Sequence, residues 1–138
     1  MRRRDFTIGL ALAAATRSAW AQEPAKQHRI AIVIAGGTIA RISETSTEPL
    51  SRRFYRAFFA ELRRLGDVEG QNLTIERYAG EGRPEGYADL AREVVSHNPD
   101  LIVASTNPIA LAVRAATATI PIVFLGVEAV RVGLVTFA

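Results

Sequence analysis

Residues 30–37 read IAIVIAGG, and this stretch decides the fold. Six consecutive Ile, Val and Ala residues are typical of a strand that is buried on both faces of a parallel sheet. The two glycines that follow permit a sharp turn, because glycine adopts positive φ without a steric penalty. We therefore expect a buried strand over residues 30–35 that ends in a tight turn lining a cleft.

The first helix is expected shortly after this turn. Its predicted buried face consists of apolar residues spaced four, four and three apart, namely Phe54, Phe58, Leu62 and Leu65. The Ser51 hydroxyl can cap the first turn, and Gly66 can adopt the left-handed conformation that ends many helices. The pattern therefore predicts a helix between Ser51 and Gly66.

The rest of the chain continues to alternate between extended and helical patterns. Short apolar or alternating runs predict strands over residues 73–78, 101–104 and 122–125. Helical spacing predicts a helix over about 85–97, and a third helix is expected to begin at Asn107, which would cap it. The order β-α-β-α-β-α-β predicts an α/β fold, a parallel sheet with helices on both faces.

The carboxyl ends of parallel strands are where ligands of such sheets bind. Candidate ligand-binding residues are therefore those that follow the first, third and fourth strands: Gly36, Gly37, Thr38, Ser105, Thr106, Asn107, Gly126, Val127 and Glu128. Asn107 can be a plain helix cap while Thr106 faces the ligand. Glu128 can take an ammonium group, or it can be an exposed loop charge.

The first 21 residues have the pattern of a signal peptide. Arginines at positions 2–4 precede an apolar run over residues 8–15, and residues 19–21 (AWA) have the small-x-small form of a cleavage site. The run is too short to span a membrane as a helix. We expect residues 1–21 to direct export to the periplasm, by the twin-arginine route because residues 3–6 read RRDF, and residues 22–28 to form a tether.

Charge and composition exclude several functional classes. The first 21 residues account for the whole positive excess, which leaves 13 basic and 13 acidic residues and no electrostatic footprint of a nucleic-acid-binding protein. The chain has no Cys, which excludes disulfides, thiolate metal sites and a cysteine nucleophile. His28 and His97 have no visible partners for a triad or a metal site. We expect no catalytic residues, no metal, no cofactor and no nucleic-acid partner.

Residues 35–40 (AGGTIA) resemble the Thr-Gly-Gly-Thr-Ile-Ala signature of bacterial-type asparaginases. The nucleophilic Thr of that signature precedes the two glycines, and Ala35 at this position has no hydroxyl for covalent catalysis. The second motif of those enzymes, His-Gly-Thr-Asp-Thr, is absent. An asparaginase-like fragment is therefore kept only as an alternative.

Several stretches together resemble the exported solute-binding proteins of ABC transporters, in the tryptophan/tyrosine-type family of periplasmic binding proteins. These stretches are residues 3–6 (RRDF), 62–73 (LRRLGDVEGQNL), 115–124 (AATATIPIVF) and 133–135 (GLV). The resemblance implies two α/β lobes of the type I periplasmic-binding class that close on a small-molecule solute. It also implies an ABC permease in the membrane as the partner and no catalysis, and the family's known ligands include aromatic amino acids.

Two departures from the family pattern affect the expected cleft. Family members carry Asp-Pro soon after the fourth strand, where this chain has Glu128-Ala129, and they continue into a second lobe, where this chain stops at Ala138. We therefore expect residues 29–138 to be a truncated N-terminal lobe that supplies half of the cleft. The alternative from another class is a small flavodoxin-like α/β enzyme or regulator that is complete at this length.

Overall fold

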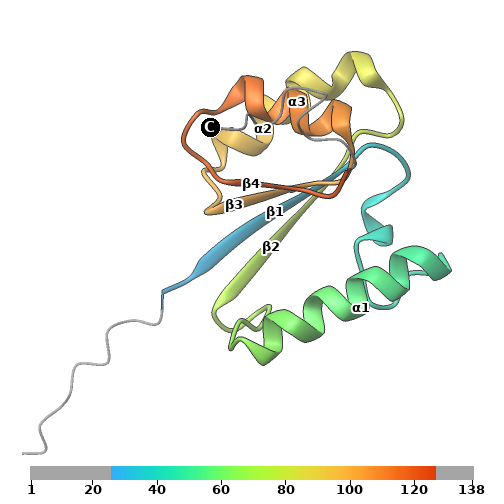
Figure 1. The fold of residues 1–138 in the computed structure, drawn as a ribbon, viewed down its shortest axis with the longest axis vertical. Coiled ribbons are helices and arrows are strands. Elements are labelled where there is room, and N and C mark those ends of the chain that lie inside the picture. The colour runs from blue at the N-terminus through green and yellow to red at the C-terminus, as the bar shows by residue number, and fades with distance from the viewer. Residues whose placement is uncertain (1–25, 127–138) are drawn as a thin grey trace, which may run out of the picture.

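Four parallel strands and three helices make up the part of the chain that the computed structural model describes, residues 26–126 (Figure 1). The strands are β1 (His28–Ile34), β2 (Leu73–Ala79), β3 (Leu101–Ala104) and β4 (Ile122–Phe124). The helices are α1 (Pro49–Arg64), α2 (Tyr87–Ser96) and α3 (Asn107–Ala116), with short 3-10 turns η1 (Ile39–Arg41) and η2 (Pro84–Gly86). The predicted α/β fold with a parallel sheet is confirmed.

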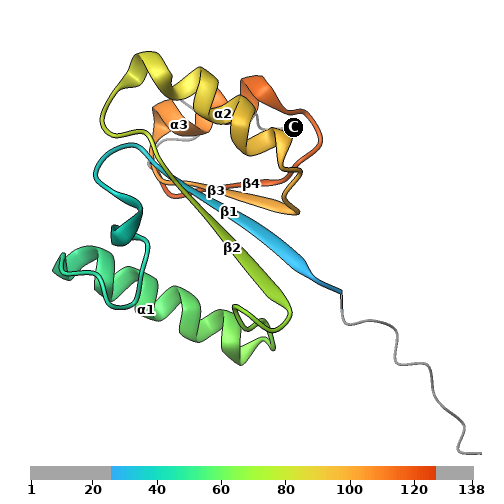
Figure 2. The ribbon, with the colours of Figure 1, turned by 180° about the vertical axis from the view of Figure 1, so that it is seen from behind.

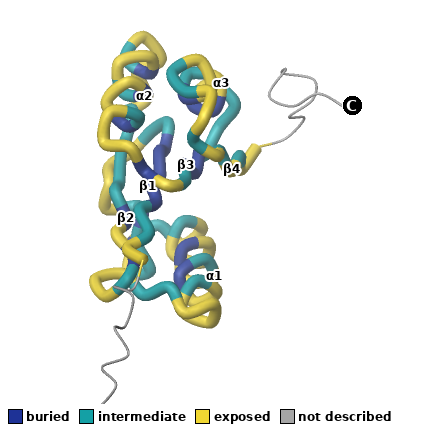
Figure 3. Tube along the Cα trace, turned by 90° about the vertical axis from the view of Figure 1, so that its left-hand side faces the viewer, coloured by how far each residue is buried: buried dark blue, intermediate teal, exposed yellow. Residues whose placement is uncertain are grey.

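The helices cover both faces of the sheet. α1 lies against one face, and α2 and α3 lie against the other (Figures 1 and 2). β1 contributes to both cores, because Ala31 and Val33 pack with α2 and α3 while Ile30, Ile32 and Ile34 pack with α1. This double burial is the reason that the first strand carries no polar side chain between residues 30 and 34 (Figure 3).

The strand order β2-β1-β3-β4 places a topological switch point between β1 and β3. The chain leaves β1 toward α1 on one face, and it leaves β3 toward α3 on the opposite face (Figure 1). The two connections therefore diverge above neighbouring strands, which pair in register from Ile30 with Leu101 to Val33 with Ala104. A crevice between diverging loops is the usual binding place in such sheets.

Two helices have a different N-cap residue from the one that the sequence predicts. α1 starts at Pro49, two residues before Ser51, and the Ser51 hydroxyl donates to a carboxylate oxygen of Glu48 (2.7 Å) rather than capping the helix. Asn107 is the first helical residue of α3, and Thr106 takes the N-cap position without a side-chain cap hydrogen bond. Proline fits the first turn of a helix, where its missing N–H is not needed. Pro49 and Pro108 therefore lie inside the first turns of α1 and α3, and each N-cap residue precedes the predicted one.

The buried face of α1 differs from the predicted one. Tyr55 and Phe59 are its buried residues, whereas Phe54 is 39% exposed and Leu65 is 62% exposed. Phe58 and Leu62 are half-buried against the core. Tyr55 and Phe59 each follow a residue of the predicted face by one position, so the helix offers two neighbouring aromatic stripes and the spacing does not decide between them. The helix is therefore rotated, and it carries an exposed apolar flank that includes Leu50 and Phe54.

None of the described helices is both long and apolar enough to cross a lipid bilayer. The expected signal peptide over residues 1–21 lies outside the described residues.

The rotation of α1 can be tested with two substitutions of the same residue type on this helix. Phe59→Ala should lower the free energy of unfolding by about 3–5 kcal/mol, because it empties a buried site. Phe54→Ala should cost less than about 1 kcal/mol, because the side chain is partly exposed. Urea denaturation measures both values, and equal losses or the reverse order would contradict the observed orientation.

Candidate functional site

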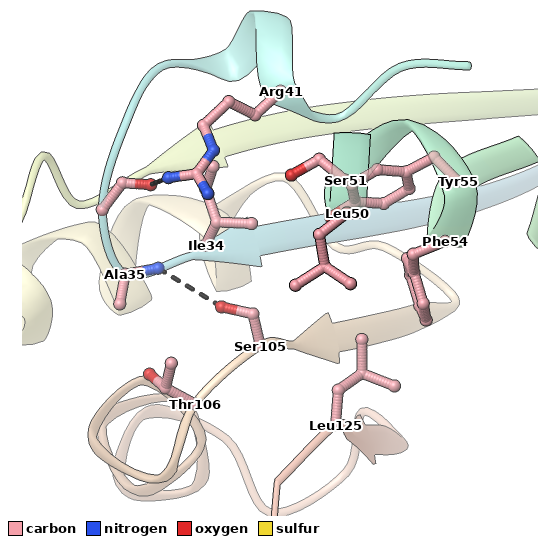
Figure 4. Close-up of a pocket in the computed structure, with 11 residues that line it drawn as sticks. Ile34, Ala35, Arg41, Leu50, Ser51, Phe54, Tyr55, Ser105, Thr106 and Leu125 are labelled. Atoms are coloured by element: carbon pink, nitrogen blue, oxygen red, sulfur yellow. Dashed lines mark hydrogen bonds between the residues drawn. The ribbon is translucent and has the colours of Figure 1, made fainter. Parts of the chain in front are cut away.

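A pocket of about 470 Å³ lies at the carboxyl ends of β1 and β3, beside the first turns of α1 (Figure 4). Pockets of roughly 300–1,000 Å³ are typical of small-molecule sites. Its floor comes from the strand ends, including Ile34, Ala35 and Ser105, and its side comes from Leu50, Phe54 and Tyr55 of α1. The pocket therefore occupies the crevice that the topological switch point creates.

The backbone of Ala35 is fixed by hydrogen bonds from several elements. Its N–H donates to the Ser105 hydroxyl after β3 (3.3 Å, Figure 4). Its carbonyl accepts hydrogen bonds from the Gly82 N–H (2.8 Å) and from the Tyr87 hydroxyl on α2 (3.0 Å). The turn after β1 is thus joined to the β2–α2 connection, to α2 and to β3, which gives the pocket a fixed floor.

Glycine is required where Tyr87 reaches this turn. A Cβ atom on Gly80 would overlap with the Tyr87 ring and would come within 3.0 Å of the Ala35 carbonyl oxygen. The Gly80 N–H also donates to the Ile34 carbonyl (2.8 Å), so the backbone has little freedom to move away. The residues 80–82 (GEG) therefore form a turn against the end of β1.

One end of the pocket is polar. Arg41 lies over the turn after β1, where its Nη1 donates to the Gly36 carbonyl (3.4 Å) and its Nη2 pairs with Glu48 (Figure 4). The hydrogen bond from Ser51, followed by the Arg41 guanidinium, holds the pKa of the Glu48 carboxyl below its usual value. The Glu48 carboxyl is therefore ionised at neutral pH. Across the pocket, Thr106 has a buried hydroxyl with no hydrogen-bond partner among the described residues.

The other end of the pocket is apolar. Leu50 and Phe54 face Leu125 at the end of β4 (Figure 4). Leu50 is 75% exposed, and Phe54 and Leu125 are each 39% exposed. Beside them, burial raises the pKa of the Tyr55 phenol, so this ring is neutral at physiological pH. The arrangement can hold an apolar body at one end and hydrogen-bonding or charged groups at the other.

The structure brings some of the predicted site residues to the pocket. Gly36, Ser105 and Thr106 line it. Gly37 and Thr38 are exposed and do not line it, and Asn107 and Gly126 lie next to each other at its margin without lining it. Val127 and Glu128 lie outside the described residues.

Sequence reasoning missed the residues that α1 and η1 contribute. The sequence did contain a signal for Leu50 and Phe54. Residues 49–64 carry more apolar side chains than one buried face of a helix needs, which indicates a second apolar face. Arg41 had no such signal, because its position depends on how the turn at residues 36–37 folds back. Over residues 26–126, no three ligating side chains come together as a metal site would require.

A family model described as "ABC transporter substrate binding protein" matches residues 47–137. The match covers about two thirds of the chain and includes α1, β3 and β4, which contribute to the pocket. Among curated proteins, none matches this sequence.

Three solved structures have the same fold over 80% of this chain. The first is a conserved domain protein from Vibrio cholerae O1 biovar eltor (29% identity, TM-score 0.65). The second is a ligand-free, open substrate-binding protein with adhesive properties from Clostridium difficile (24%, 0.64). The third is an ABC domain from Streptococcus pneumoniae in complex with L-Trp (18%, 0.63). The matched part covers 34% of each of these chains, so it spans about a third of their length.

The close contact between Tyr87 and Gly80 at the turn after β1 predicts different effects for two Gly→Ala substitutions. Gly80→Ala should lower the free energy of unfolding by about 1–3 kcal/mol, because the added methyl group overlaps with Tyr87. Gly86→Ala is the control, because φ there is −92° and an added Cβ meets no atom within 4 Å. This control should be neutral or stabilise the fold by up to about 1 kcal/mol. Chemical denaturation measures the free energy of unfolding of both variants. An unchanged value for Gly80→Ala would mean that the Tyr87 ring does not pack against Gly80.

Proposed function

The chain belongs to the family of ABC transporter substrate-binding proteins, and from that premise we propose that it supplies one wall of the solute-binding cleft of an ABC importer. The wall binds and releases a small solute and performs no chemistry on it. Delivery of the solute requires an ABC permease in the membrane. The strand order would also suit a flavodoxin-like protein, but fold does not determine function, and the family match favours solute binding.

The observation that carries this proposal is a pocket that is built on one side only. Ligand sites usually bury about 70–90% of a small molecule's surface. Here Leu50, Phe54 and Leu125 face the pocket, yet each remains more than a third exposed. A second surface opposite them would complete the enclosure. In the related structures, two thirds of each chain lies outside the matched part and offers room for such a surface.

The polarity of the wall supports an amino-acid-like solute. Its apolar end, Leu50, Phe54 and Leu125, suits a hydrophobic side chain, and its polar end, Arg41, Ser105 and Thr106, suits charged or hydrogen-bonding groups. The structure from Streptococcus pneumoniae holds L-Trp, a molecule with the same division between an apolar ring and a charged end.

The proposed route to the cleft is export. The signal-peptide pattern over residues 1–21 supports delivery to the periplasm, and family membership supports the same location. In that compartment the chain would meet its solute before the permease does.

We expect an incomplete cleft to bind its solute weakly, at the residues that line the pocket. Titration of the ¹⁵N-labelled chain with L-tryptophan should shift the amide signals of Gly36, Ser105, Thr106 and Leu125, with a Kd in the millimolar range. The affinity is low because much of the ligand stays in water. Leu125→Ser should weaken the binding of L-tryptophan further, because it removes apolar contact with the ligand.

Two results would contradict the proposal. Micromolar affinity for the isolated chain would show that the pocket is complete without a second wall. Shifts that fall away from these four amides, or no shifts for any amino acid or small carboxylate tested, would show that this pocket is not the solute site.

A further inference from the structure

Arg41 is the one charged side chain among the described residues that line the pocket. It comes from η1, the short turn between β1 and α1, and not from a strand end. Its guanidinium lies at the polar end of the pocket, over the turn that Ala35 and Gly36 form (Figure 4). Any charged group on the solute would therefore meet this cation first on the described wall.

The turn after β1 is shaped to hold the Arg41 side chain. Gly37 has φ of +82°, and a Cβ atom on it would overlap with the Arg41 Cδ and lie 2.6 Å from its Nη1. The missing side chain lets the arginine stem fold back across the turn. The Gly36 carbonyl and Glu48 then hold the guanidinium at two of its nitrogens. The position of Arg41 is thus fixed before a ligand arrives, which lowers the entropic cost of binding.

The guanidinium retains donors for a ligand. It has five N–H groups, and the described contacts use Nη1 for Gly36 and Nη2 for Glu48. Its side chain is 41% exposed, so the remaining N–H groups are accessible. Arginine binds carboxylates well because its planar fork matches the two oxygens of that group.

The rest of the described lining favours an anion over a cation. No Asp or Glu side chain lines this wall between residues 26 and 126, so an ammonium group finds no anionic partner in the pocket. The buried Thr106 hydroxyl lacks a hydrogen-bond partner in the same part of the chain, and a polar head group of either charge on the ligand would satisfy it. Leaving such a group unpaired costs about 1–3 kcal/mol.

We infer that Arg41 sets the charge specificity of this wall by binding a carboxylate of the solute, with Gly37 and Glu48 as its positioning residues. This inference rests on the proposed function and names the ligand class. The ligand is a small carboxylate with an apolar body that lies against Leu50, Phe54 and Leu125. Among the described residues that line this wall, an amino group on the solute finds no carboxylate partner.

Three probes with the same phenyl ring but different head groups test the inference. They are 3-phenylpropionate, 2-phenylethylamine and 3-phenylpropanol, which are anionic, cationic and neutral at pH 7. Each is titrated into the ¹⁵N-labelled chain at millimolar concentrations, and shifts of the pocket amides give the affinity. The carboxylate should bind at least about tenfold more tightly than the amine.

Substitutions of two arginines test whether Arg41 causes the preference for the carboxylate. Arg41→Gln should remove the preference for the carboxylate, and Arg41→Lys should retain part of it, because lysine keeps the charge but not the fork. Arg53→Gln is the matched control. Arg53 is an exposed arginine on α1 that does not line the pocket, so this variant loses the same charge and should keep the preference. The ¹⁵N spectrum of each variant reports whether the fold is intact.

The outcomes separate the inference from the proposed function. Equal binding of the three probes, or a carboxylate preference that survives Arg41→Gln, overturns the role of Arg41 and leaves solute binding intact. An equal loss in Arg41→Gln and Arg53→Gln assigns the preference to overall charge and also overturns it. If no probe shifts the pocket amides, the pocket is not a solute site and both proposals fail.

Discussion

The hydrogen bonds to the backbone of Ala35 are the interaction on which the rest of the structure depends. They fix the end of β1 where the chain must leave toward one face of the sheet while β3 sends it toward the other. Ser105 and Tyr87 reach this point from β3 and α2. Because these elements meet at one residue, the turn after it has a defined direction. The pocket is the space that remains between the diverging connections.

The division of the pocket into a polar and an apolar end follows from the same constraint. The turn after β1 directs η1 back over the strand ends and brings Arg41 to one side. The rotation of α1 buries Tyr55 and Phe59 and leaves Leu50 and Phe54 on the other side. Exposure of an apolar flank of this kind to water costs free energy. Contact with a ligand or with the proposed opposing surface would recover this free energy.

Much of the fold could be predicted from the sequence, because the relevant patterns are local. Residues 30–34 lie between two cores and need apolar side chains on both faces, and this requirement is visible without a structure. The rotation of α1 could not be predicted, because this helix carries two adjacent aromatic pairs, Phe54 with Phe58 and Tyr55 with Phe59, and spacing alone does not decide which pair is buried. For the site, strand ends pointed to Gly36, Ser105 and Thr106. Arg41 could not be predicted, because its place depends on the fold of the turn before it rather than on spacing.

The central claim is that the wall formed by Leu50 and its neighbours is open, and thiol labelling tests it directly. The chain has no Cys, so a single introduced thiol reports on one position. In the folded chain, the thiol of Leu50→Cys should react with a maleimide at nearly the rate of the denatured chain, because Leu50 is 75% exposed. The thiol of Phe59→Cys, at a site that is 5% exposed, should be strongly protected. Strong protection of both thiols would show that this chain already covers the wall, and would contradict the account.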